Sequence, residues 1–104
     1  MVERELHSWN LDLEEAVKVQ ARLRDQLLLA WDGRKIDTIA GVDIGLTAAS
    51  ARAAVVVLRY PDLSPLESVT AEAPLVFPYI PGLLAFREGP AFLAAWDKLH
   101  TQAD

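Results

Sequence analysis

The chain of 104 residues contains no cysteine, which excludes disulfide bridges and thiolate metal sites. No apolar run approaches the roughly 20 residues that a membrane-spanning helix needs. The N-terminal residues Met1 to Trp9 lack the apolar core of a signal peptide. We therefore expect a protein of the reducing cytoplasm. The sequence also lacks internal repeats, low-complexity tracts and linkers, so it holds one domain at most.

Basic residues are fewer than acidic ones: ten Lys and Arg against fifteen Asp and Glu, giving a net charge of −5. Proteins that bind nucleic-acid phosphates usually present a basic surface, so this balance argues mildly against such a partner. The hydrophobic fraction of 52% and the charged fraction of 24% are typical of a folded globular domain rather than a disordered one.

The first regular element that the sequence predicts is a helix over residues 13–30. Asp12 and Glu15 have the spacing of a capping box at its start, and Gly33 is a suitable stop. Apolar residues recur at helical spacing and predict a buried stripe: Ala16, Val19, Leu23, Leu27 and Ala30. Trp9 is expected to pack against the start of this helix, whereas Trp31 and Trp96 are expected in or near the core.

Three strands are predicted next, over residues 38–45, 53–61 and 66–76, the first of them buried. Short connections favour an antiparallel meander, and Pro74 suits an edge strand. A short helix should then end near Glu88, with Gly89-Pro90 separating it from a second helix that reaches His100. This order indicates an α+β or α/β fold with part of the sheet missing.

Asp43 is a carboxylate within an apolar strand, where burial is costly unless the charge is paired or binds a metal. Strand alternation places it on one face with Ile39 and Gly41. It could also lie at the strand end and cap the next turn. Glu88 alone would usually be solvated. Together, two carboxylates from separate elements suit a hard cation such as Mg²⁺, which binds through one or two carboxylates plus water and phosphate.

Tyr79 lies between Pro78 and Pro81, which restrict the backbone over residues 77–81. A stiff, extended loop tip that carries an aromatic and an aliphatic side chain could enter a stack of bases with little ordering cost. The alternative is that Tyr79 packs on the sheet. His7 and His100 have no partner at metal spacing and receive no role.

Three segments, IAGVDIG, AAVVVLRYP and FPYIPGLLAFREGPAFLAAWDKL, together resemble the N-terminal half of the endonuclease V family. PYIPG followed by FRE is the specific part of the match. The resemblance implies a ribonuclease-H-like α/β fold. It also implies cleavage of DNA, or of RNA, at the second phosphodiester bond 3′ to a deaminated base such as hypoxanthine (inosine), with Mg²⁺ or Mn²⁺.

The same resemblance implies roles for individual residues. Asp43 and Glu88 correspond to metal-binding catalytic carboxylates. The segment Pro78-Tyr79-Ile80-Pro81 corresponds to a wedge that separates the strands beside the lesion. Gly82 and Leu84 would contribute to the pocket for the flipped base.

A third carboxylate of the family lies on a further strand, so residues 1–104 are expected to form a partial domain with little or no cleavage activity. Asp104 lacks the matching context and receives no role. An unpaired strand 38–45 would expose an apolar edge, which predicts self-association. Two other hypotheses stay open: a non-catalytic nucleic-acid-binding or assembly module, and a structural α+β domain.

Overall fold

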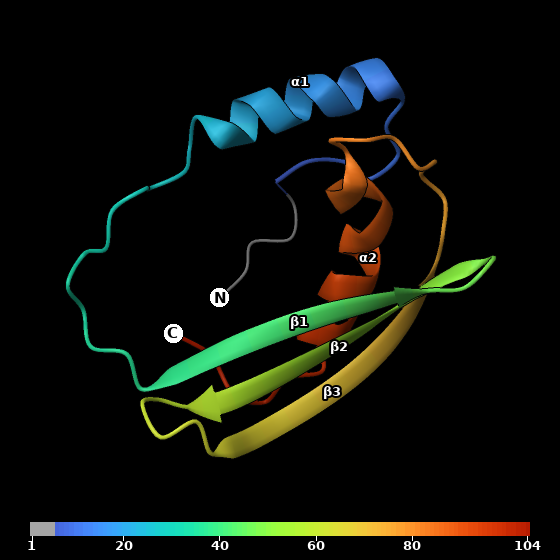
Figure 1. Ribbon diagram of the computed structural model, residues 1–104. Helices are drawn as coiled ribbons and strands as arrows, with labels where there is room; N and C mark the ends of the chain where they lie inside the picture. Colours follow the sequence, from blue (N-terminus) through green and yellow to red (C-terminus); the bar gives the residue numbers. More distant parts are fainter. Residues whose placement is uncertain (1–5) are drawn as a thin grey trace.

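The computed structural model describes residues 6–104 (Figure 1). In chain order the elements are α1 (Leu13–Arg24), β1 (Thr38–Leu46), β2 (Ser50–Arg59), β3 (Pro65–Pro74) and α2 (Leu84–Trp96). Figure 1 shows α2 crossing one side of a curved sheet, with α1 beyond the first turns of α2 and away from the strands. None of the helices in this part of the chain has the length and apolar character needed to cross a bilayer.

The three strands form the predicted antiparallel meander, in the order β1-β2-β3. Val42 pairs with Val55, and Val55 pairs in turn with Val69. Paired residues on neighbouring strands share a face, so this register fixes which side chains point toward α2. Pro74 is the last residue of the edge strand β3, where its missing N–H removes no internal ladder bond, as predicted.

The core lies between the sheet and α2. Every second residue of β2 is buried, and Ala51, Ala53 and Val55 form one cluster with Ala91 and Ala95 of α2. Small side chains at these positions allow the helix to approach the sheet closely. Full burial of a valine side chain such as Val55 contributes about 1.5–3 kcal/mol.

Helix α1 begins as predicted and ends early. The Asp12 carboxylate accepts a hydrogen bond from the Glu15 backbone N–H at 2.8 Å, and the Glu15 side chain completes the capping box. The prediction that the helix continues to Ala30 is wrong, because it stops at Arg24. Leu28 beyond that point is 94% exposed, so no burial offsets the cost of ordering further turns.

Two tryptophan predictions have different outcomes. Trp31 lies in the irregular segment after α1 and is 56% exposed, with the Arg34 guanidinium 5.4 Å from its ring, so its expected core position is wrong. Trp96 is half-buried at the end of α2 and packs against the core cluster, as expected.

The predicted break at Gly89-Pro90 is also wrong, because α2 runs without interruption through both residues. Proline lacks the N–H that a helix interior uses. Buried residues nevertheless lie on both sides of Pro90, Phe86 before it and Ala91 after it, so packing holds the two halves together.

The expectation that residues 38–45 form a buried strand is also wrong. Gly41 to Asp43 are exposed because β1 has a neighbour on one side only.

Candidate functional site

Tyr79 projects from the loop between β3 and α2 and is 67% exposed. Its neighbours behave differently: Phe77 is buried, and Ile80 packs on a cluster formed by Ala16, Phe77, Leu83 and Phe86. The alternative prediction, in which Tyr79 packs on the sheet, is therefore wrong. The loop is anchored by the residues beside Tyr79 and presents its aromatic ring to solvent.

A tight turn follows Tyr79. The Leu83 N–H donates to the Ile80 carbonyl at 3.0 Å, and Gly82 has a φ of +85°. Proline at the second position and a left-handed residue at the third are features of a type II turn. A Cβ on Gly82 would meet no atom within 4 Å, so glycine is needed here for its backbone conformation.

The two carbonyl groups that flank this loop are each held by a side chain from a helix. Gln20 of α1 donates through Nε2 to the Gly82 carbonyl at 2.7 Å. Arg87 of α2 donates through Nη1 to the Phe77 carbonyl at 3.0 Å. Sequence reasoning assigned no role to either residue. The available signal was the position of Gln20 one turn after Ala16, on the same face of α1.

Asp43 lies on β1 opposite Ala54 and is exposed. Its Oδ1 accepts a hydrogen bond from the N–H of the next residue, Ile44, at 3.0 Å. Val42 lines a cavity beside α2 and Ile44 packs on the core cluster, so alternation places the Asp43 side chain on the opposite face of the sheet.

Glu88 is half-buried on α2, one turn before Phe92. In the described part of the chain, no hydrogen bond or ion pair joins it to Asp43, and no three His, Asp or Glu side chains gather as a metal cluster. Carboxylate oxygens have the right chemistry for a hard cation. The donor type therefore fits Mg²⁺, with Asp43 supplied by β1 and Glu88 supplied by α2.

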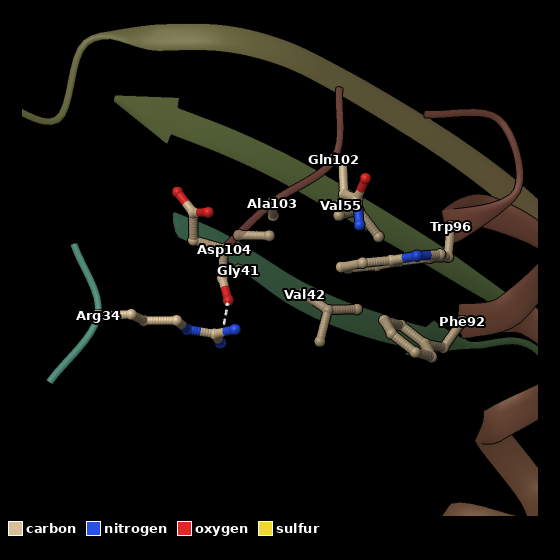
Figure 2. Close-up of a pocket in the computed structure, with 10 residues that line it drawn as sticks. Arg34, Gly41, Val42, Val55, Phe92, Trp96, Gln102, Ala103 and Asp104 are labelled. Atoms are coloured by element: carbon tan, nitrogen blue, oxygen red, sulfur yellow. Dashed lines mark hydrogen bonds between the residues drawn. The ribbon is translucent and has the colours of Figure 1, made fainter. Parts of the chain in front are cut away.

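A cavity of about 820 Å³ opens beside the unpaired edge of β1 (Figure 2). Figure 2 shows Val42 of β1 beside Phe92 and Trp96 of α2, with the C-terminal residues across from them. The Phe92 and Trp96 ring centroids lie 5.5 Å apart. The lining of this cavity is mixed: Val42, Phe92 and Trp96 supply apolar side chains, and Arg34, Gln102 and Asp104 supply polar ones.

Asp104 lines this cavity and is held by the start of β1. Asp104 Oδ2 accepts hydrogen bonds from the backbone N–H groups of Asp37 at 2.9 Å and Thr38 at 3.0 Å. These two bonds, in that order, hold the pKa of the Asp104 carboxyl below its ordinary value. Arg34 Nη2 adds a bond to the Asp104 carbonyl at 3.0 Å. The last residues are thereby fixed to the start of β1.

Glu67 of β3 has a similar role at the end of α2. Its carboxylate accepts hydrogen bonds from the backbone N–H groups of His100 and Thr101, at 2.9 Å and 2.8 Å. Bonds from His100 first, and then from Thr101, lower the pKa of Glu67. The segment after α2 is therefore tied to the sheet by one carboxylate.

Comparison with known proteins gives a consistent result. A family model described as Endonuclease V matches residues 15–104. The Endonuclease V of Nostoc punctiforme is 46% identical over 98 residues, which cover 91% of this chain and 44% of that protein. The Endonuclease V of Roseiflexus castenholzii is 45% identical over 98 residues, covering 94% and 44%. The chain thus spans about half the length of these curated relatives.

Solved Endonuclease V structures also match most of this chain and less than half of their own length. The crystal structure of Endonuclease V from Bacillus subtilis has a TM-score of 0.86 at 27% identity, covering all of this chain and 47% of that one. The Streptomyces avermitilis Endonuclease V structure has a TM-score of 0.83 at 38% identity, covering 92% and 44%. A Ciona intestinalis Endonuclease V, in complex with a 24mer DNA containing an inosine followed by a ribo-adenosine, has a TM-score of 0.72 at 26% identity, covering 82% and 38%.

Proposed function

The chain belongs to the endonuclease V family, and we propose that it recognises deaminated bases in nucleic acid as part of a metal-dependent DNA-repair endonuclease. Its three strands and two helices are part of a ribonuclease-H-like α/β fold. The observation that carries the proposal is the exposed Tyr79 ring on a loop held at both ends. The Ciona intestinalis relative bound to inosine-containing DNA supports it.

In this proposal Tyr79 is the side chain that enters the base stack. Pro78 and Pro81 restrict the loop backbone, so little conformational freedom is lost when the ring inserts. Ile80 packs on the buried cluster and acts as the anchor of the wedge rather than its tip. Stacking of a base on an aromatic side chain contributes about 1–3 kcal/mol.

Gly82 and Leu84 are proposed to line the pocket for the flipped base. Gly82 forms the turn directly after the wedge and is exposed, and Leu84 is 43% exposed at the first residue of α2. Both lie within five residues of Tyr79. A base displaced by the ring would therefore meet a small residue and an accessible apolar one.

Asp43 and Glu88 are proposed as ligands of Mg²⁺, with Mn²⁺ as an alternative ion. A bound divalent ion activates water and stabilises the leaving oxygen in phosphodiester cleavage. Asp43 offers an exposed carboxylate on β1, whereas Glu88 is half-buried on α2. Both carboxylates are proposed as ligands of the same metal site. Because residues 6–104 gather no cluster of three ligands, we expect little or no cleavage by this chain alone.

Membership of the endonuclease V family also suggests the extent of the domain, its location in the cell and its substrate. Residues 1–104 would form a partial endonuclease V domain that works in the cytoplasm on DNA, with RNA as the alternative substrate. The unpaired edge of β1, which carries the 50% exposed Val42, would promote self-association. A non-catalytic binding module is the second candidate, favoured by the placement of Asp43 on the face of the sheet opposite to Val42 and Ile44.

The proposal is tested by binding of the 104-residue chain to paired oligonucleotides with and without a central inosine, followed by fluorescence anisotropy. Tyr79→Ala should remove the preference for inosine, and Asp43→Asn should leave binding in place. Tyr60→Ala is the matched control, because Tyr60 is the other exposed tyrosine of the chain. Equal binding by wild type and Tyr79→Ala would contradict the proposal.

A further inference from the structure

We propose that α1 is the support of the Tyr79 loop, and that Gln20 and Arg87 are positioning residues that fix the loop from its two ends. This inference rests on the proposed role of Tyr79 in base recognition. It assigns a function to the N-terminal helix, which carries none of the residues predicted to contact metal or nucleic acid.

The first observation is where α1 is buried. Its fully buried residue is Ala16, and this side chain belongs to a cluster with Phe77, Leu83 and Phe86. Phe77 precedes the wedge and Leu83 closes the turn after it. Figure 1 shows α1 above the loop and the first turns of α2, well away from the strands. The helix therefore packs on the base of the loop.

The second observation is the bond between Gln20 and Gly82. Gln20 lies one turn after Ala16, so its side chain leaves α1 on the face that meets the loop. Its amide nitrogen donates to the Gly82 carbonyl at 2.7 Å, across 62 positions of sequence. That carbonyl belongs to the left-handed residue of the turn, and its direction fixes the plane of the peptide group between Gly82 and Leu83.

The third observation is the bond at the other end of the loop. Arg87 Nη1 donates to the Phe77 carbonyl at 3.0 Å in a partly buried setting. Arg87 Nε is buried and has no hydrogen-bond partner among residues 6–104. Burying a guanidinium group costs free energy unless it is hydrogen-bonded. The charge-assisted bond from Arg87 to the Phe77 carbonyl offsets part of this cost and holds that carbonyl in one orientation.

These contacts hold the backbone of the Tyr79 loop at both of its ends. Residues 78–81 lie between two fixed carbonyls, and two of the four are prolines. Tyr79 is the exposed aromatic side chain of this segment, while Ile80 is held in the cluster. A ring held in this way is ordered before nucleic acid arrives, so less ordering is required on binding. Loss of either bond should weaken selectivity for a damaged base without removing any contact to it.

The experiment compares Gln20→Glu, which replaces the donor with an acceptor of the same shape, with Gln20→Lys, whose ammonium group can still donate. Gln26→Glu is the matched control, since Gln26 is an exposed glutamine beyond the end of α1. Amide hydrogen exchange at residues 79–83 should rise about fivefold in Gln20→Glu, which corresponds to a hydrogen bond of ~1 kcal/mol. Gln20→Lys and Gln26→Glu should match wild type.

Arg87→Lys provides the second arm, because it keeps the charge and shortens the reach to the Phe77 carbonyl. We expect faster exchange near Phe77 with unchanged exchange in β2, which reports an intact fold. Exchange at residues 77–83 that stays within twofold of wild type in both Gln20→Glu and Arg87→Lys would overturn the inference.

Binding to inosine-containing DNA separates this inference from the function on which it rests. Loss of selectivity in both Tyr79→Ala and Gln20→Glu, with recovery in Gln20→Lys, supports both. Loss in Tyr79→Ala with full selectivity in Gln20→Glu overturns the positioning role and leaves the proposed function intact. No effect of Tyr79→Ala contradicts the proposed function, and the exchange data then still decide whether α1 orders the loop.

Discussion

The indole ring of Trp9 lies directly against Gly89, so that a Cβ on this glycine would come within 2.5 Å of the ring. Trp9 also makes an edge contact with Phe86 at a centroid distance of 6.3 Å. Gly89 therefore marks a close approach between the N-terminal segment and α2, not the helix break that its pairing with Pro90 predicts from sequence. Trp9 also packs against the cluster that contains Ala16, near the start of α1 as expected, so the contact with α2 adds to that packing.

Gly89→Ala should lower stability although alanine is the better helix former. The gain in helix propensity is about 1 kcal/mol, whereas overpacking against the ring costs about 1–3 kcal/mol. We expect a lower thermal midpoint and a changed tryptophan emission spectrum. Gly41→Ala is the control, because a Cβ there meets no atom within 4 Å. A Gly89→Ala variant more stable than wild type would show that Trp9 moves aside at little cost.

Acid should destabilise the chain through Glu67 and Asp104. Both carboxyl groups have pKa values lowered in the folded state by backbone N–H donors. A lowered folded pKa means that the stabilisation is complete above the unfolded pKa, about 4, and is lost as the pH falls through the folded pKa. The free energy of unfolding, measured with urea, should therefore decline as the pH falls below about 4.

Glu67→Gln isolates one of these groups. It should be less stable than wild type at pH 7, and the difference should be smaller at an acid pH below the ordinary carboxyl pKa, where the wild-type carboxylate becomes protonated. Glu72→Gln on the same strand is the control, since, among residues 6–104, Glu72 makes an exposed ion pair with Arg52 at 3.8 Å instead of bonds to backbone N–H groups. A Glu67→Gln deficit that is equal at both pH values would argue against the assigned hydrogen bonds.

Mn²⁺ provides a direct test of the two proposed metal ligands, because a bound paramagnetic ion broadens nearby amide resonances. Substoichiometric Mn²⁺ should broaden signals around Asp43, and Asp43→Asn should abolish this, while Asp25→Asn should not. Broadening at residues 87–89 in the same titration would support Glu88 as a ligand of the same ion. Undiminished broadening in Asp43→Asn would refute the assignment of Asp43.

Self-association should depend on the edge of β1. Val42 is half exposed beside the cavity that Phe92 and Trp96 line. Val42→Lys places a charge on this edge, which should shift light-scattering mass toward the monomer. Leu28→Lys tests whether the exposed segment after α1 is responsible instead. A wild-type chain that stays monodisperse and monomeric at high concentration would contradict the expectation.

Local sequence signals predicted the parts of the fold that local interactions determine. The capping box at Asp12 and the strand meander follow from neighbouring residues and short connections. The end of α1 and the continuity of α2 depend on what each segment buries: Leu28 finds no partner surface, while buried residues flank Pro90. Such outcomes depend on tertiary contacts, which residue spacing does not reveal.

The features of the candidate site that depend on neighbouring residues were also predicted from sequence, and those that depend on long-range contacts were not. Prolines around Tyr79 predicted a stiff loop, and alternation along residues 38–45 predicted the faces of β1 correctly. The bond from Gln20 to Gly82 spans 62 residues, and no motif points to it. Which face of β1 meets α2 becomes visible only when strand register and helix packing are combined.

The central claim is that the exposed ring of Tyr79 recognises a deaminated base, and one binding measurement tests it most directly. Anisotropy titrations compare the 104-residue chain with Tyr79→Ala and Tyr60→Ala on matched duplexes that differ by a single inosine. Loss of one stacking contact, about 1–3 kcal/mol, predicts at least a fivefold fall in affinity for the inosine duplex in Tyr79→Ala alone. Equal affinities of all three proteins for the inosine duplex would contradict the account.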